Sequence, residues 1–349
     1  MKQFLMRIQQ KLESNFYITP NIITYLLLPF SYLFRGLVFM RHLLYGADLF
    51  KVTSFSRPVV VIGNITVGGT GKTPLIIWLT NYLKAKGYKV GVVSHGYGVK
   101  TIKIPQFVDE ETAVACGDEP YLIYRHTQVP VVVSSDRVAA VQLLLQQKGV
   151  DVVLSDDGLQ HYSMDRTLEV AVVDGTRLFG NRLCLPAGPL REPVSRLNYV
   201  QYVVLNLPQV AQFSMCREQL MRDIELRSEQ VFGMQLMPGK LVSVADFNEQ
   251  KAITDLQEKK VHAVSGIGNP KRFFDLLEQL GVQIVPHVFP DHHLFTLEDI
   301  DFGDTSFVIM TEKDAVKCRS FADQRHWFLP VQAEVSQSFG DAIIDFLSM

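Results

Sequence analysis

The chain has 349 residues, 47% of them hydrophobic, and a formal net charge of -2. This length and composition suffice for two α/β domains and exclude a disordered chain, and the charge gives no global reason to expect nucleic acid. Cys116, Cys184, Cys216 and Cys318 lie far apart without a C-x-x-C pair. That spacing predicts neither a disulfide framework nor a zinc site and fits a reducing cytoplasm.

The amino-terminal region is unusually apolar. Residues 22–34 read I-I-T-Y-L-L-L-P-F-S-Y-L-F, and a second apolar stretch at 37–40 follows Arg35. A spanning helix needs about 20 uninterrupted apolar residues. Pro29 and Arg35 interrupt this one, and no basic region leads into a signal-peptide cleavage site. We therefore expect residues 1–45 to form a membrane-associated helical segment in the bilayer interface, with a core helix that covers the sheet as the alternative.

A glycine-rich loop follows the first apolar strand. Residues 58–63 predict that strand, and residues 66–73 read T-V-G-G-T-G-K-T before an apolar helix at 75–83. In such a loop the backbone N–H groups face phosphate oxygens, Lys72 reaches the β and γ phosphates, and Thr73 ligates Mg²⁺. The first glycine of the usual pattern is replaced by threonine, so a glycine-rich turn with a solvated lysine is the alternative. The predicted ATP-binding residues are Thr66, Gly68, Gly69, Thr70, Gly71, Lys72 and Thr73.

Further short apolar runs follow the loop, separated by stretches of helical character such as 137–148. They lie at 89–94, 129–134, 150–155, 170–174 and 202–206. Continuous rather than alternating apolar strands indicate a sheet buried on both faces, which means mostly parallel strands with helices on either side. We expect a P-loop-type α/β domain over 46–228, with its ligands at the carboxyl ends of the strands.

The pattern changes near residue 230. Residues 231–236 and 241–244 predict a β-hairpin, and we expect a hairpin linker over 229–258. A second, smaller α/β domain is expected over 259–349. Its predicted strands lie at 262–265, 283–287, 306–310 and 327–331, with helices at 271–280 and at the carboxyl end.

Two carboxylates end the predicted strand at 152–155. Asp156 and Asp157 are followed by G-L-Q-H. An aspartate at a strand tip beside a P-loop can hold Mg²⁺ directly or through water, as in a Walker B element. A helix N-cap is the alternative for one of them, and the residues alone do not decide which aspartate contacts the metal.

Asp118 starts a predicted helix in the motif G-D-E-P, so a helix-capping role is a serious alternative. A phosphoryl-transfer enzyme also needs a carboxylate or similar base to orient the attacking hydroxyl. The motif F-P-D-H-H at 289–293 supplies imidazoles that can pair with such a carboxylate. Adjacent side chains of an extended segment point opposite ways, so we expect only one of His292 and His293 to face the site.

Two further loops carry charged residues. In the motif L-P-A-G-P-L-R-E-P, Arg191 can neutralise a transferring phosphoryl group and Glu192 can complete a magnesium shell, with a salt-bridged surface loop as the alternative. Residues 311–314 read T-E-K-D. Guanine recognition by N-K-x-D needs one residue between lysine and aspartate, so we reject a GTPase.

The ordered set of motifs resembles the bacterial tetraacyldisaccharide 4'-kinase family of lipid A synthesis. Each motif is modest alone, but together they run in order from about residue 60 to 318. They are T-V-G-G-T-G-K-T-P, G-D-E-P, D-D-G-L-Q-H, L-P-A-G-P-L-R-E-P, S-G-I-G-N-P, F-P-D-H-H and T-E-K-D-A.

The resemblance implies transfer of the γ-phosphoryl group of ATP to the 4'-hydroxyl of a tetraacylated glucosamine disaccharide 1-phosphate, which yields the bisphosphate lipid A precursor, lipid IVA. It implies Mg²⁺ as cofactor, the acylated lipid and the inner-membrane surface as partners, and no protein or nucleic-acid partner. The expected location is peripheral, on the cytoplasmic face of the bacterial inner membrane. The apolar amino terminus would place the catalytic cleft at headgroup level.

The resemblance also assigns roles to matching residues. Asp118 is the base and works with a histidine, for which we choose His292 over His293, while Arg191 lies near the γ-phosphate. The implied magnesium ligands are Thr73, Asp157 and Glu192. One departure concerns residues 94–98, where the family's S-R-G-Y-G reads S-H-G-Y-G. His95 could hold a phosphate only when protonated.

Two other classes are less well matched. A P-loop regulatory ATPase with the motif K-G-G-x-G-K-T needs a first lysine that reaches across a dimer interface, and Val67 occupies that position. A soluble small-molecule kinase would need no apolar amino terminus.

Overall fold

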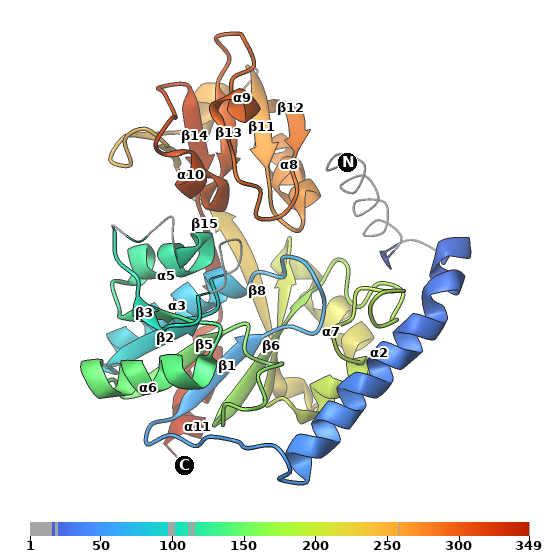
Figure 1. Ribbon diagram of the computed structural model, residues 1–349. Coiled ribbons are helices and arrows are strands. Elements are labelled where there is room, and N and C mark those ends of the chain that lie inside the picture. The colour runs from blue at the N-terminus through green and yellow to red at the C-terminus, as the bar shows by residue number, and fades with distance from the viewer. Residues whose placement is uncertain are drawn as a thin grey trace.

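The computed structural model describes residues 16–17, 20–96, 102–110, 112, 116–257 and 259–348. Within these residues the chain forms two bodies, each built on its own sheet (Figure 1). We call them the large body and the small body. The predicted pair of α/β sheets is thus confirmed.

The large body contains a mostly parallel, nine-stranded sheet. In spatial order the strands are β15 (Val331–Val335), β8 (Val231–Pro238), β7 (Tyr202–Leu207), β6 (Leu168–Asp174), β1 (Val59–Gly63), β5 (Val152–Asp156), β2 (Val90–Ser94), β4 (Val131–Val133) and β3 (Gln106–Phe107). β1 is buried along its whole length and lies parallel to β5 and β6. Ile62 pairs with Asp156, so both strands end at the same edge of the sheet.

Helices cover both faces of this sheet, as the continuous apolar strands predict. On one face the core contains side chains of α3 (Lys72–Ala85), α5 (Asp118–Thr127) and α11 (Gln337–Leu347). On the other face the core contains side chains of α6 (Arg137–Lys148) and α7 (Phe213–Met221). Short 3₁₀ turns lie at Val194–Tyr199, Val210–Gln212, Ser228–Gln230 and Ile253–Leu256.

The small body is a six-stranded sheet with its own apolar core. Its strands, in spatial order, are β10 (Gln250–Lys251), β9 (Leu241–Ser243), β14 (His326–Leu329), β13 (Val308–Thr311), β11 (Lys260–Ser265) and β12 (Gln283–Val288). Its helices are α8 (Pro270–Gln279), α9 (Leu297–Ile300) and α10 (Glu312–Cys318). α8 packs Phe273 and Leu277 into one side of the core, and α10 packs Ala315 and Cys318 into the other.

The predicted hairpin between the two bodies is wrong. β8 pairs with β7 and β15, so both of its edges are occupied, and β9 pairs with β10 and β14 in the other sheet. The chain instead crosses between the sheets twice, and the crossings touch where the Gly239 N–H donates to the Pro330 carbonyl at 2.9 Å. β15 and α11 therefore return to the large body. We propose these two crossings as the domain boundaries, in place of a linker over 229–258.

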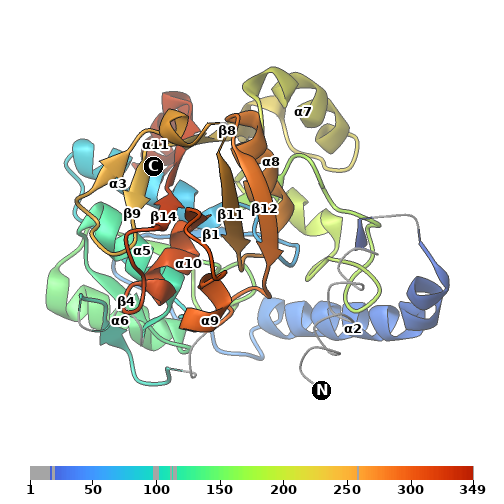
Figure 2. The ribbon, with the colours of Figure 1, turned by 90° about the horizontal axis from the view of Figure 1, so that it is seen from above.

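The helix α2 (Ile22–Gly46) lies along the outside of the large body (Figures 1 and 2). Asn21 caps it by accepting hydrogen bonds from two backbone N–H groups, and the Ser31 hydroxyl donates to the Cys184 carbonyl at 2.7 Å. A stripe of apolar side chains on α2 stays more than half exposed: Leu26, Phe30, Leu33, Leu37 and Met40. Among the described residues this is the one helix long and apolar enough to cross a membrane. Because its apolar stripe is exposed, α2 does not serve as a core helix over the sheet.

Candidate active site

The P-loop joins the carboxyl end of β1 to α3. The Val67 N–H donates to the Pro189 carbonyl at 2.8 Å, which holds the start of the loop against the segment that carries Arg191. Gly71 has φ of +96° and its Cα faces the Asn206 side chain, so a side chain would meet both backbone strain and a clash. The first turn of α3, which starts at Lys72, thus presents its N–H groups at the strand ends. This geometry suits phosphate oxygens.

Asp157 lies between two cations at the strand tip. Its Oδ1 is 3.5 Å from Lys72 Nζ and its Oδ2 is 2.8 Å from Arg191 Nη1. Burial opposes ionisation, but Lys72 and Arg191 overcome it and hold the pKa of Asp157 well below its usual range. Asp157 also has φ of +52°, a strained conformation for a residue with a side chain. The carboxylate is therefore ionised and fixed in place.

Asp156 has a different environment, although it is the adjacent residue. Its Oδ2 accepts a hydrogen bond from the Ser94 hydroxyl at 2.9 Å, and it does not line the cavity that Asp157 lines. Burial raises the pKa of Asp156 to about 7. Of the two aspartates that the sequence could not separate, the structure turns Asp157 toward the phosphate loop.

Asp118, at the start of α5, is only 6% exposed. It does not cap the helix, because the cap position is Gly117. Its Oδ1 lies 3.5 Å from His292 Nδ1 and its Oδ2 lies 3.4 Å from Lys317 Nζ. Burial favours the neutral acid, yet the hydrogen bond to His292 and the charges of Lys313 and Lys317 hold the pKa of Asp118 well below its usual range.

His292 comes from the small body, in the loop between β12 and α9. Its pairing with Asp118 raises the pKa of the imidazole, and its φ of +58° is again strained. His293 instead pairs with Asp299 at 3.1 Å and packs against Phe289. The structure therefore brings His292, and not His293, to the carboxylate of Asp118.

Glu192 is buried and held by side chains of its own surroundings. It is 2% exposed and accepts hydrogen bonds from Gln160 Nε2 at 2.7 Å and from the Tyr162 hydroxyl. Arg196 also approaches it, at 3.8 Å, and Glu192 does not line the cavity. Its metal role stays a prediction.

The other two predicted magnesium ligands, Thr73 and Asp157, can supply part of the coordination shell of a magnesium ion. Thr73 is 5% exposed and lines the cavity together with Asp157, whose Oδ1 accepts no hydrogen bond from the described residues. An ionised oxygen and a hydroxyl are suitable ligands for Mg²⁺. The described part of the chain contains no cluster of three or more His, Cys, Asp or Glu side chains that could hold a metal alone. Because Mg²⁺ usually keeps waters and phosphate oxygens as ligands, two protein ligands are compatible with it.

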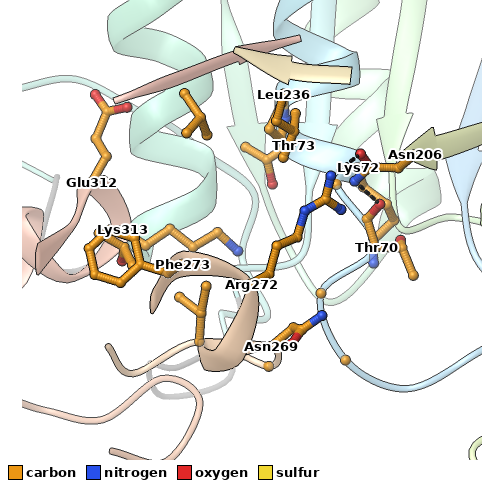
Figure 3. Close-up of a pocket in the computed structure, with 18 of the residues that line it drawn as sticks. Thr70, Lys72, Thr73, Asn206, Leu236, Asn269, Arg272, Phe273, Glu312 and Lys313 are labelled. Atoms are coloured by element: carbon orange, nitrogen blue, oxygen red, sulfur yellow. Dashed lines mark hydrogen bonds between the residues drawn. The ribbon is translucent and has the colours of Figure 1, made fainter. Parts of the chain in front are cut away.

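A cavity of about 620 Å³ lies between the two bodies. The large body contributes the P-loop, Asp157 and Arg191, and the small body contributes His292, Lys313 and Arg272. Figure 3 shows Arg272 reaching from α8 toward Asn206, to whose Oδ1 it donates at 2.7 Å.

Sequence reasoning missed several of the residues in this cavity. The Asn206 side chain donates to the Thr70 carbonyl at 2.8 Å, and so links Arg272 to the P-loop. Asn206 ends an apolar strand that the sequence did predict, and a polar residue at a strand's carboxyl end is a recognisable signal. Arg272 had no local signal, and Lys313 was given no role in the site although it belongs to the motif T-E-K-D, because both reach the cavity only through the packing of the two bodies.

His95 occupies the position where the sequence departs from the family motif. Burial and the nearby charge of Arg137 lower the pKa of its imidazole. The neutral form is therefore favoured, and this weighs against a phosphate contact that requires the protonated form. Tyr97 and Gly98 of the same motif lie outside the described residues.

The fold and cavity define a P-loop protein with a carboxylate–imidazole pair beside the phosphate site. A family profile described as "Tetraacyldisaccharide-1-P 4'-kinase" matches residues 23–348. A tetraacyldisaccharide 4'-kinase of Methylobacillus flagellatus is 43% identical over 320 residues, with 91% of this chain and 90% of the relative covered. One from Coxiella burnetii is 44% identical, with 93% and 91% covered.

A solved structure is also similar. It is a crystal structure described as an "apo" form of LpxK from Aquifex aeolicus in complex with ATP, and it covers 93% of this chain and 100% of its own. The TM-score is 0.73 at 29% sequence identity. The chain belongs to the tetraacyldisaccharide 4'-kinase family, which confirms the resemblance that the motifs indicated.

Proposed function

We propose that this chain transfers the γ-phosphoryl group of ATP to the 4'-hydroxyl of a tetraacylated glucosamine disaccharide 1-phosphate. The observation that carries this proposal is that His292, which pairs with the buried Asp118 carboxylate, lines the same cavity as the P-loop. Family membership supports the identity of the acceptor, and the ATP complex of the related structure supports ATP as donor.

The P-loop and its neighbours form the donor site. The loop N–H groups and the Lys72 ammonium bind the phosphate oxygens, and Arg191 neutralises charge that grows on the γ-phosphoryl group. Lys72 and Arg191 both pair with Asp157 in this structure, so each is already aimed at the strand tip. Phosphate oxygens can share these cations with the aspartate.

Asp118 is the group that accepts the proton of the acceptor hydroxyl. The hydroxyl oxygen forms its bond to the γ-phosphorus while the β–γ bridging oxygen leaves with the bonding electrons as part of ADP. His292 holds the carboxylate in the required orientation. It remains next to the Asp118 carboxyl group after that group has accepted the proton of the hydroxyl. An ionised, oriented carboxylate is the form that this step requires.

Thr73 and Asp157 would hold Mg²⁺ beside the phosphates, and the ion would neutralise charge on the β and γ oxygens. The Asp157 Oδ1, which accepts no hydrogen bond from the described residues, and the buried hydroxyl of Thr73 support this assignment. Glu192, whose carboxylate oxygens accept hydrogen bonds from Gln160 and Tyr162, is the third proposed ligand.

The exposed stripe on α2 supports attachment to a membrane surface, which we propose to be the cytoplasmic face of the inner membrane. An acceptor with four acyl chains stays in the bilayer, so the cavity has to reach the headgroup level. Replacing Leu26 and Leu33 by glutamate should reduce co-flotation with anionic lipid vesicles at least several-fold. The matched control replaces Ile104 and Met215, which are equally exposed apolar residues on other surfaces, and should float normally. Equal flotation of both variants would contradict attachment through α2.

The function itself can be tested with radiolabelled ATP, Mg²⁺ and the acylated disaccharide dispersed in detergent. Label should appear on the lipid when the 4'-hydroxyl is free and should be absent when that hydroxyl is blocked. Release of labelled phosphate without labelled lipid would instead indicate an ATPase, and label on a water-soluble sugar would indicate a small-molecule kinase.

A further inference from the structure

The segment T-E-K-D-A contacts the catalytic helix α5, although the proposed function gives it no role. α10 lies directly above α5 (Figures 1 and 2) and meets it in four ion pairs, one of which joins Glu312 to Arg125 at 3.8 Å. Glu312 approaches His126 at 2.8 Å, Lys313 pairs with Glu119, and Lys317 lies 3.4 Å from Asp118. Two lysines one turn apart thus face two adjacent carboxylates.

Lys317 holds the side of Asp118 that His292 leaves open. His292 approaches Oδ1 and Lys317 approaches Oδ2, so the two oxygens have one cationic partner each. The Lys317 side chain is 13% exposed and its ammonium lies 5.6 Å from the Phe295 ring. Such a buried ammonium needs anionic partners, which restricts where it can lie.

The other partner of Lys317 is itself fixed. Asp314 is fully buried, and its Oδ1 lies 3.2 Å from Lys317 Nζ. Its Oδ2 accepts hydrogen bonds from the Thr311 hydroxyl at 2.7 Å and from the Gly266 N–H at 2.9 Å. The ammonium is therefore anchored within the small body before it meets Asp118 of the large body.

We propose that Lys317 is a positioning residue for the phosphoryl-transfer reaction: anchored by Asp314, it fixes the second oxygen of the Asp118 carboxylate. This inference rests on the proposed function, because it assumes that Asp118 is the base. The fixed carboxylate presents one defined oxygen toward the acceptor, and small errors in such an orientation slow catalysis strongly. Asp314 of the motif T-E-K-D-A then serves the catalytic base through Lys317, which lies two residues beyond the motif.

The charge of Lys317 also acts on the pair that it faces. Lys317 faces the pair formed by Asp118 and His292. The other charged groups near that pair come from α5, the loop before α9, and α10; they are Glu119, Asp291, Lys313 and Asp314. A cation beside the carboxylate competes with the imidazolium for the same negative charge. Removing Lys317 should therefore raise the pKa of His292 further, since one cation fewer would compete with the imidazolium for the Asp118 carboxylate.

The test compares three variants of the full chain. Lys317→Met removes the cation and keeps most of the side-chain volume, Lys317→Arg keeps the cation, and Glu312→Gln removes a neighbouring ion pair between the same two helices. We expect Lys317→Met to lower kcat on the order of tenfold with the KM for ATP within about twofold. Lys317→Arg should recover most of kcat. Glu312→Gln should leave the titration of His292 unchanged.

His292 can be followed by NMR titration of isotope-labelled histidine, without the lipid acceptor. A rise in its pKa in Lys317→Met but not in Glu312→Gln is the expected result. If Lys317→Met and Glu312→Gln lower kcat equally, arginine fails to rescue, and the His292 titration does not move, then Lys317 only braces the two bodies and the inference is overturned. A wild-type protein that transfers no phosphate to lipid would overturn the proposed function instead, and the titration would still report on Lys317.

Discussion

The two walls of the cavity are built in different ways. The large-body wall is local in sequence: the phosphate loop, its lysine and the start of α3 are continuous from 66 to 73, and Asp157 directly follows the adjacent strand. The small-body wall is assembled from several segments that lie far apart in the sequence, with residues such as Arg272, His292 and Lys313. These reach the chemistry only because the two bodies pack together. Donor binding should therefore depend mainly on the large-body wall, and transfer on both.

The largest effect should come from Asp118→Ala, which removes the carboxylate that pairs with His292 and Lys317 of the small body. Transfer should fall by about 10²–10⁴-fold, because the attacking hydroxyl loses its base. The Kd for ATP should stay within a few-fold of the wild-type value, since no P-loop contact changes. Steady-state kinetics and calorimetric titration with ATP measure the two quantities. Near-normal turnover would remove Asp118 from the catalytic role.

Lys72→Ala should weaken both binding and transfer, since its ammonium serves the phosphates in the ground state and in the transition state. We expect the Kd for ATP to rise by about tenfold and kcat to fall as well. Lys86→Ala is the matched control, because Lys86 forms an exposed ion pair with Asp341 elsewhere on the surface. A Lys72→Ala protein with unchanged ATP affinity would show that the loop lysine does not contact nucleotide in the ground state.

Gly268→Ala tests the contact between the walls. A Cβ at residue 268 would lie 2.6 Å from the Gly69 nitrogen and 2.9 Å from the Gly68 Cα, so the small body would have to move away from the P-loop. Such overlaps typically cost about 1–3 kcal/mol, and we expect a several-fold higher KM for ATP. Gly36→Ala in α2, where a Cβ meets nothing within 4 Å, serves as the control. Unchanged kinetics for both variants would mean that this contact is dispensable.

The smallest effect concerns pH and stability. Asp118 raises the pKa of His292 in the folded protein, so the stabilisation is fully present below the ordinary histidine value of about 6.5 and is lost as pH rises through the raised value. The difference in unfolding free energy between wild type and His292→Gln should be under about 1 kcal/mol and should shrink between pH 6 and pH 9. Thermal melts across this range measure it. A difference that grows with pH would contradict the pairing.

Features that depend on local sequence patterns could be predicted from the sequence, whereas features that depend on contacts between distant segments could not. Continuous apolar strands identified the parallel sheet, and the motif at 66–73 identified the phosphate loop, because both are local patterns. The hairpin failed, since two neighbouring extended segments do not reveal that β8 already has partners on both edges. Lys317 was not singled out, because its role depends on a carboxylate almost 200 residues earlier in the chain.

Within one dipeptide the sequence also could not separate Asp156 from Asp157. Strand alternation and the positive φ of Asp157 turn the two carboxylates into different environments. One is buried beside the Ser94 hydroxyl, and the other faces two cations. Only the three-dimensional arrangement of those partners decides which carboxylate stays ionised.

A double-mutant cycle on Asp118 and His292 tests most directly the claim that transfer depends on both walls acting together. The variants are Asp118→Asn, His292→Gln and the double variant, with kcat for lipid phosphorylation as the readout. Because the two side chains act as one unit, the double variant should be about as slow as Asp118→Asn alone. Effects that multiply, so that His292→Gln slows Asp118→Asn by the same factor as it slows the wild type, would show that the residues act independently and would contradict the account.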